Sequence, residues 1–425
     1  MSSSDDTPLM QQWREAKSRH RDALLFFRVG DFYELFHSDA EEGSRLLGLT
    51  LTSRNNGAAA RVPLAGIPAK ALDDYLARLV RLGRRVAICD QVEDPALAKG
   101  IVKREVTEMI TPGTVLAEGL LSERRNNFLV AVVPDGADAF GLAVLDVSTG
   151  ELSARRVPQA ELTAELGRLE AAELLLPRVL ETSRLLVREA GGPAFTFRDD
   201  WMFEADVCAR ELLRVYAVQS LEGFGFQAAD TALVRAAGAL VQYLREIRPG
   251  GVTHLRPVTI LRPGHVMLLD EMTRRNLELV EPLRAGEEGG TLLAVVDETV
   301  TAMGARLLRR WILEPLVVLE EIWRRQDAVT ELHENTKLRR GIRDALKGIS
   351  DLERLAGKVG TGRVAPRDLL GLRRSLERLP AIRDAGGAAA SDLLRALTSE
   401  LDCLEDLADL LGRAIADEAP ATLQD

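Results

Sequence analysis

The hydrophobic pattern of the chain changes at Pro249-Gly250-Gly251, and this change limits the folds open to it. Before the break, short apolar and alternating runs are mixed with helical segments, which is typical of α/β domains. From Leu268 onward, apolar residues recur at helical spacing between short breaks. Helices with a one-sided apolar stripe must pack on their neighbours to persist. The sequence therefore predicts a multidomain α/β plus all-α protein.

A second break, Thr111-Pro112-Gly113-Thr114, turns the chain out of its first α/β region. A chain of 425 residues is long enough for two to three domains, each with its own core. We expect a mixed α/β domain at 1–115, a β-hairpin followed by α/β elements at 116–250, and a helical region at 251–425. In the helical region, Asn276 is predicted to lie on a buried stripe.

Composition excludes several classes of protein. No run approaches the roughly 18 apolar residues of a membrane span, and the start lacks the basic and apolar regions of a signal peptide. A cytoplasmic location is the resulting expectation. The three cysteines and five histidines show no disulfide framework and no metal-ligand spacing, so we expect reduced, buried thiols and no metal site.

The net charge of -10 is a poor match for a protein that binds nucleic acid through a global field. Its distribution is uneven: residues 1–115 hold 16 Lys and Arg against 16 Asp and Glu, so the rest of the chain carries the whole -10. Any contact with DNA must come from local basic clusters, such as Arg81, Arg84 and Arg85 or Lys99, Lys103 and Arg104. The alternative for each cluster is an ordinary solvated face.

Residues 24–36 read as a strand, a break at Gly30-Asp31 and a second extended run. If that run is extended, Phe32 and Glu34 share one face and Tyr33 lies on the other. An exposed ring can enter a duplex between base steps from the minor groove, and a polar side chain beside it can meet the disturbed base. The alternative, which spacing alone favours, is a core phenylalanine beside a solvated glutamate.

The order of residues supports the DNA-binding interpretation. Gly-Asp-Phe-Tyr-Glu-Leu-Phe at 30–36, followed by Leu-Gly-Leu-Thr-Leu-Thr-Ser-Arg at 47–54, resembles the mismatch-reading segment of the MutS family of DNA mismatch-repair proteins. The resemblance implies that Phe32 and Glu34 contact the mispaired base. Arg54 and Arg61, expected in a polar loop, and Lys70 are candidates for contacts with the DNA backbone. At Ala69-Lys70 the family usually has an aromatic residue and a histidine.

The resemblance continues along the chain. Val-Ala-Ile-Cys-Asp-Gln-Val at 86–92, Ile-Thr-Pro-Gly-Thr at 110–114 and Met-Gly-Ala-Arg-Leu-Leu-Arg-Arg-Trp-Ile-Leu-Glu-Pro-Leu at 303–316 fall where the family has similar strings. It implies a mismatch-recognition domain, a ribonuclease-H-like connector domain and a helical core, or lever, domain. Residues Arg306, Arg309 and Arg310 read as a charged helix face and are expected to bridge helices.

A Gly-x-x-x-x-Gly-Lys-(Ser/Thr) phosphate loop is absent from the sequence, so we expect no ATPase activity and no cofactor in this chain. In the family, ATP and Mg²⁺ bind in a C-terminal half. We therefore expect a chain truncated before the DNA clamp and the ATPase. The partners that the family implies are mismatched double-stranded DNA, a MutL-type repair protein at the connector and, in the intact protein, a second copy. A bacterial, nucleoid-associated location is implied and a membrane partner is not.

Two other functions stay open. The chain could be an interaction scaffold for repair partners without mismatch specificity. A ribonuclease-H-like nuclease would need three or four convergent carboxylates at a metal site. Asp146 ends the predicted strand at 140–146, where one such carboxylate could lie, but no partners are evident at matching strand ends.

Overall fold

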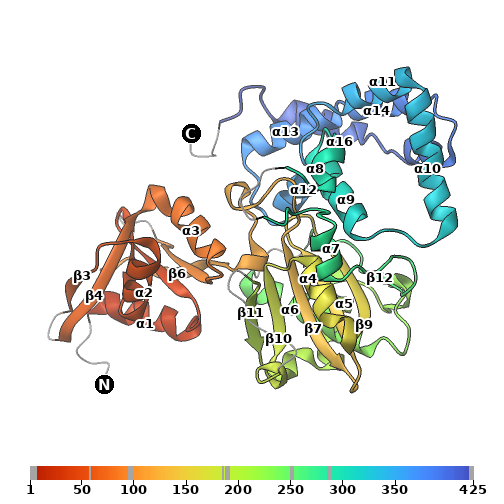
Figure 1. The fold of residues 1–425 in the computed structure, drawn as a ribbon. Helices are drawn as coiled ribbons and strands as arrows, with labels where there is room; N and C mark the ends of the chain where they lie inside the picture. Colours follow the sequence, from red (N-terminus) through yellow and green to blue (C-terminus); the bar gives the residue numbers. More distant parts are fainter. Residues whose placement is uncertain are drawn as a thin grey trace.

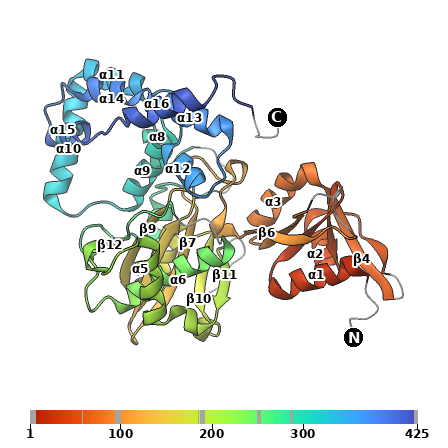
Figure 2. The same ribbon diagram turned by 180° about the vertical axis from the view of Figure 1, so that it is seen from behind.

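The computed structural model describes residues 7–56, 59–93, 100–183, 186, 192–248, 253–284 and 289–420; the side chains of 54–56, 59–61 and 118 lie outside this description. It contains two six-stranded sheets followed by a helical region. Figures 1 and 2 show the first sheet, with its helices, beside the second, and the later helices gathered at one end of the second sheet. The predicted combination of α/β and all-α parts is confirmed.

The first sheet has the strand order β3-β4-β2-β1-β5-β6, in which only β1 and β5 pair in parallel. Helix α1 (Pro8–Arg19) packs on one face through Met10 and Trp13, while α2 (Ser38–Leu47) and α3 (Leu72–Arg81) cover the other. Strand β1 is apolar on both faces: Leu25 and Phe27 pack on the α1 side, and Leu24 and Phe26 pack on the other. The strands are β1 (Leu24–Val29), β2 (Phe32–Phe36), β3 (Thr52–Asn56), β4 (Ala59–Pro68), β5 (Val86–Gln91) and β6 (Arg104–Ile110).

The prediction of a polar loop before Val62 is wrong. Strands β3 and β4 form an antiparallel pair there, with Thr52 opposite Leu64 and Arg54 opposite Val62. The pair could not be predicted from apolar alternation, because β3 is an edge strand whose described side chains, Thr52 and Ser53, are polar and exposed. Arg54 and Arg61 are therefore strand residues by backbone, although their side chains lie outside the described part of the structure.

The second sheet has the order β11-β10-β7-β8-β9-β12. Strands β7, β8 and β9 form an antiparallel meander, and β10, β11 and β12 each join in parallel. The buried helix α6 (Thr231–Ile247) covers one face with α5 (Ala205–Tyr216), and α4 (Leu162–Leu169) covers the other. The strands are β7 (Phe128–Asp135), β8 (Ala139–Asp146), β9 (Glu151–Pro158), β10 (Glu173–Pro177), β11 (Ala194–Arg198) and β12 (Thr259–Leu261).

The region after 266 is helical, but its first part differs from expectation. Met267 to Leu283 holds only one short helix, α7, because Glu278 has a φ of 45°. Asn276 is exposed, so the buried stripe predicted around it is wrong. The helices are α7 (Glu271–Asn276), α8 (Leu292–Val296), α9 (Ala302–Leu313), α10 (Leu319–Glu334), α11 (Thr336–Leu346), α12 (Leu352–Gly360), α13 (Pro366–Leu376), α14 (Leu379–Gly386), α15 (Asp392–Ser399) and α16 (Glu405–Ala414).

The cysteines and the helix lengths bear on the classes of protein that composition excludes. Cys89, Cys208 and Cys403 are buried thiols, as predicted. None of the helices in the described ranges combines the length and apolar character needed to cross a bilayer. The break at 249–251 lies outside the described residues.

Candidate nucleic-acid interface

Phe32 is the most unusual residue of the first sheet because it is an apolar ring left 49% exposed at the start of a strand. Its neighbours Tyr33 and Leu35 are buried. A two-residue turn, Gly30-Asp31, joins β1 to β2 and pairs Val29 with Phe32; Gly30 takes the positive φ of 59° that the turn requires. The alternative that Phe32 is a core residue is therefore wrong.

Glu34 lies on the same face of β2 as Phe32, as alternation predicts. The register places Phe32 opposite Pro68 and Glu34 opposite Gly66 on the neighbouring strand β4. Farther along the same face, Phe36 is fully buried beneath α1, where its ring meets Trp13 with the centroids 6.0 Å apart. Phe32, Gly66 and Pro68 are exposed and Glu34 is half-buried. This corner of the sheet thus presents a ring and a carboxylate to the outside.

Tyr33 anchors the strand from the opposite face. Its hydroxyl donates to Asp90 Oδ2 at 2.8 Å, and the guanidinium of Arg28 lies 5.1 Å from the centre of its ring. Burial and the bond to Asp90 raise the pKa of Tyr33 to about 12, so the hydroxyl stays a donor at neutral pH. Alternation along the strand predicts that Tyr33 lies on the face away from Phe32, but nothing in the local sequence indicates its bond to Asp90.

The turn before Phe32 is held at both of its residues. Arg28 Nε donates to the carbonyl of Gly30 at 2.5 Å, and the amide of Ala69 donates to the carbonyl of Asp31 at 2.8 Å. The second bond ties the turn to the 3-10 segment Ala69–Ala71. Phe32 is consequently carried by a braced hairpin and not by a loose loop.

The predicted cations are distributed unevenly around this corner. Lys70 is exposed in the segment Ala69–Ala71, two residues after Pro68, and so lies close to the Phe32 turn. The basic clusters farther away are engaged: Arg84 pairs with Glu42 at 3.0 Å, Arg85 pairs with Asp22, and Lys103 pairs with Glu105 at 2.7 Å. Their ion pairs favour the structural interpretation of these clusters.

Asp146 is fully buried at the end of β8, and its carboxylate holds the following turn. One oxygen accepts from the amide and hydroxyl of Ser148 at 3.0 and 2.6 Å, and the other accepts from Asn126 Nδ2 at 2.7 Å. Among the residues that the structure describes, no group of His, Cys, Asp and Glu is placed to hold a metal ion. These contacts give Asp146 a structural role.

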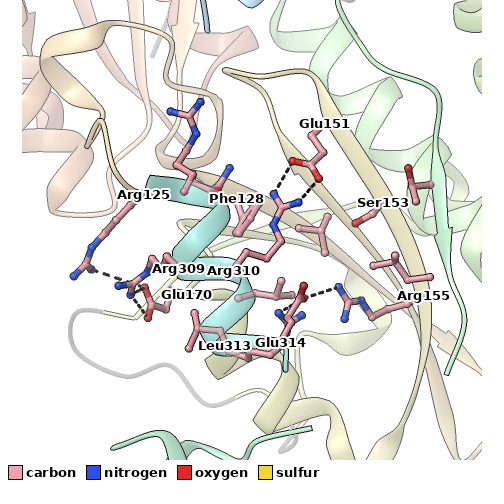
Figure 3. Close-up of a pocket in the computed structure, with 17 residues that line it drawn as sticks. Arg125, Phe128, Glu151, Ser153, Arg155, Glu170, Arg309, Arg310, Leu313 and Glu314 are labelled. Atoms are coloured by element: carbon pink, nitrogen blue, oxygen red, sulfur yellow. Dashed lines mark hydrogen bonds and ion pairs between the residues drawn. The ribbon is translucent and has the colours of Figure 1, made fainter. Parts of the chain in front are cut away.

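A cavity of about 240 Å³ lies between the second sheet and α9 (Figure 3). Arg310 makes a two-pronged pair with Glu151 of β9, in which Nη1 and Nη2 each donate to one carboxylate oxygen at 2.7 Å. Arg309 donates from Nη2 alone to both oxygens of Glu170, at 2.8 Å each. Both carboxylates belong to the second sheet and its α4 connection. For Arg310, the expectation that it bridges helices is wrong, because it joins α9 to strand β9 instead. Arg309 joins α9 to the C-cap residue of α4, so it does connect two helices.

Arg306 does bridge helices. It is buried and reaches Asp351 and Glu353 at the start of α12, at 2.6 and 2.7 Å. Burial disfavours its charge, but the two carboxylates outweigh that effect and raise its pKa. A buried, paired guanidinium also means that this is not the simple charged surface that the sequence indicated.

Sequence models of the three N-terminal domains of one protein family match this chain in order: MutS domain I over residues 7–119, MutS domain II over 127–256 and MutS domain III over 272–425. The chain belongs to the MutS family. The family resemblance predicted from the residues around Phe32 is thereby confirmed over nearly the whole chain.

Individual members of the family are similar to this chain over almost its whole length. The DNA mismatch repair protein MutS of Chlorobaculum tepidum is 43% identical over 426 residues, which cover 99% of this chain and 48% of the relative. Those of Methanothrix thermoacetophila and Myxococcus xanthus are each 44% identical, over 99% of this chain and 47% of their own length. The chain therefore spans about half the length of these curated relatives.

Proposed function

We propose that this chain recognises mismatched DNA in mismatch repair, with Phe32 stacking at the mispaired base and Glu34 hydrogen-bonding it. The observation that carries the proposal is the exposed Phe32 ring, presented beside Glu34 at an uncovered corner of the sheet. An inserted ring unstacks a base step and kinks the duplex. The Tyr33 anchor and the braced turn hold the ring while that work is done.

Discrimination follows from the cost of deforming DNA. Unstacking a nucleotide costs a few kcal/mol and costs least where pairing is already broken. The same ring therefore favours a mismatch without reading sequence. Glu34 adds a penalty on normal duplex because a carboxylate repels phosphates unless a disturbed base rewards it with a hydrogen bond. Arg54, Arg61 and Lys70 are proposed to contact the DNA backbone and position the duplex.

The remaining parts take the roles that the family implies. We propose a mismatch-recognition domain at 1–115, a ribonuclease-H-like connector at 116–250 and a core or lever region at 251–425. The sheet β11-β10-β7-β8-β9-β12, with helices on both faces, supports the second assignment. The connector would receive a MutL-type partner. Dimerisation and ATP hydrolysis with Mg²⁺ are assigned to the intact protein, and this chain is proposed to be no enzyme by itself.

Replacing Phe32 by alanine tests the proposal. We expect Phe32→Ala to lower the preference for a G·T or unpaired-T duplex over homoduplex by about tenfold or more, because the loss of a stacked ring removes at least about 1.4 kcal/mol. Fluorescence anisotropy titrations with the three duplexes measure the ratio. Trp201→Ala, which removes a 53% exposed ring from the second sheet unit, is the matched control.

An unchanged ratio in the Phe32→Ala variant would overturn the proposal. Failure of the wild-type chain to bind any duplex at low salt, together with binding to a MutL-type protein, would instead favour the interaction scaffold. Metal-dependent cleavage that Asp146→Asn removes would be required for the nuclease, and the structural bonds of Asp146 argue against it.

A further inference from the structure

Gly66 lies within β4, directly opposite Glu34, and it is exposed. Pro68, two residues on, is opposite Phe32. By alternation, all four residues occupy the same face of the sheet. The glycine therefore forms the floor of the corner at which Phe32 and Glu34 are presented.

The fold does not require a glycine at this position. Gly66 is not among the residues with positive φ, so its backbone suits any residue. A Cβ atom added there would lie 3.5 Å from the carbonyl oxygen of Tyr33 and 3.7 Å from Glu34 Cγ, which are ordinary van der Waals contacts. By contrast, a Cβ on Gly141 or Gly238 would lie 2.5 Å from backbone atoms of the neighbouring α6 or α5. Those glycines are needed for packing, and Gly66 is not.

A glycine within a strand carries a cost, because it loses more conformational freedom on folding than alanine and has no side chain to pack. When neither backbone conformation nor internal packing explains it, the remaining reason is that another molecule approaches the backbone closely. The neighbours of Gly66 indicate the chemistry of that molecule. An aromatic ring, a carboxylate and bare backbone together suit a flat group with hydrogen-bond donors, such as a nucleobase edge.

We infer that Gly66 is a specificity-determining residue that leaves space beside Glu34 for the mispaired nucleotide. Because Gly66 has no side chain, the duplex can approach β4 closely enough for the base edge to reach the Glu34 carboxylate while the Phe32 ring is inserted. This inference rests on the proposed function. It adds a steric requirement that neither Phe32 nor Glu34 supplies.

The test adds side chains of increasing size at Gly66. We expect Gly66→Leu to lower affinity for a G·T duplex by about tenfold, and Gly66→Ala to lower it less, while homoduplex affinity changes little, because only the inserted complex brings DNA to this floor. Melting temperature should stay at the wild-type value or rise in Gly66→Ala. Gly412→Ala, an added methyl in open space on α16, is the matched control.

The outcomes separate this inference from the proposed function. Wild-type G·T affinity in Gly66→Leu, with the preference lost in Phe32→Ala, overturns only the role of Gly66. Wild-type behaviour of both variants overturns the proposed function as well. If Gly66→Leu does not fold, Gly66→Ala decides the question, since among the described residues its Cβ meets only ordinary van der Waals contacts. An unchanged ratio of G·T to homoduplex affinity in that variant overturns the inference.

Discussion

Adjacent residues of β2 serve opposite faces of the same sheet. Phe32 and Glu34 are offered outward, whereas Tyr33 between them is buried and bonded to Asp90. Extended backbone makes this possible because successive side chains point in opposite directions. A ring that must be pushed into a base stack needs such an anchor, since a mobile strand would give way before the bases part. The residue that anchors the proposed interface is thus the immediate neighbour of Phe32 and Glu34.

Glu34→Ala should tighten binding to homoduplex by about twofold to fivefold, because it removes a partly exposed charge that repels phosphates. Affinity for the G·T duplex should fall or stay the same, so the preference shrinks. Anisotropy titrations at two salt concentrations measure both effects, and the gain on homoduplex should fade at high salt as screening increases. Glu34→Gln, which keeps hydrogen-bonding groups without the charge, is the control. Weaker homoduplex binding in Glu34→Ala would contradict the repulsion argument.

Between elements, the chain leaves the first sheet through the turn Thr111–Thr114, and Glu173 at the start of β10 holds this turn. The Glu173 carboxylate is fully buried and accepts from the Thr111 hydroxyl and from the Gly113 amide at 3.0 Å. It also accepts from Thr196 of β11 and Tyr243 of α6, both at 2.6 Å. One carboxylate therefore joins the exit turn, a strand and a helix.

Glu173→Gln should destabilise the chain even though the side chains have the same shape. The amide nitrogen of glutamine would face donors, leaving at least one buried donor without an acceptor at a cost of about 1–3 kcal/mol. Urea unfolding monitored by circular dichroism measures the loss. Glu222→Gln, at an exposed position, should change stability by less than about 0.5 kcal/mol. Equal stability of the two variants would show that the buried network is not needed.

Across the whole molecule, two ion pairs join α9 to the second sheet and its α4 connection. Arg309 and Arg310 pair with Glu170 and Glu151, and among the described residues the buried apolar clusters contain no side chain of α9. Ion pairs are directional but contribute little net free energy when partly exposed. These two pairs therefore give the contact of α9 a specific geometry, and each contributes modestly to its strength.

Arg309→Ala should loosen this contact. Hydrogen exchange followed by mass spectrometry is expected to speed up in α9 and in the segment around Glu170, while exchange in the first sheet stays unchanged. Arg309→Lys should restore part of the protection, because an ammonium nitrogen can replace the single Arg309 nitrogen that donates to both Glu170 oxygens. The exposed Arg324→Ala on α10 is the control. Unchanged exchange in α9 of the Arg309→Ala variant would show that the pair does not hold the contact.

Local sequence pattern determined most of the elements and the shared face of Phe32 and Glu34, because the repeat of a strand or helix is a property of the backbone at a few neighbouring residues. Family membership and the candidate residues also followed from sequence, through the order of residues around 30–36. Local pattern did not predict elements whose pairing or packing partners are distant in the chain or few in number. The polar β3 and the truncated α7 both depend on neighbours that the local sequence does not identify.

Tertiary structure alone decided which residues are exposed. Phe32 and Phe36 have the same residue type on the same face of one strand, yet α1 covers Phe36 and leaves Phe32 open. In the same way, the helical pattern predicts Arg306 on a charged surface, but the fold buries it beside Asp351 and Glu353. Burial depends on which element covers which face, and that is set by contacts between residues far apart in the chain. Alternation along β2 is thus enough to show which side chains share a face, but the packing of α1 is needed to show that Phe32, and not Phe36, is exposed.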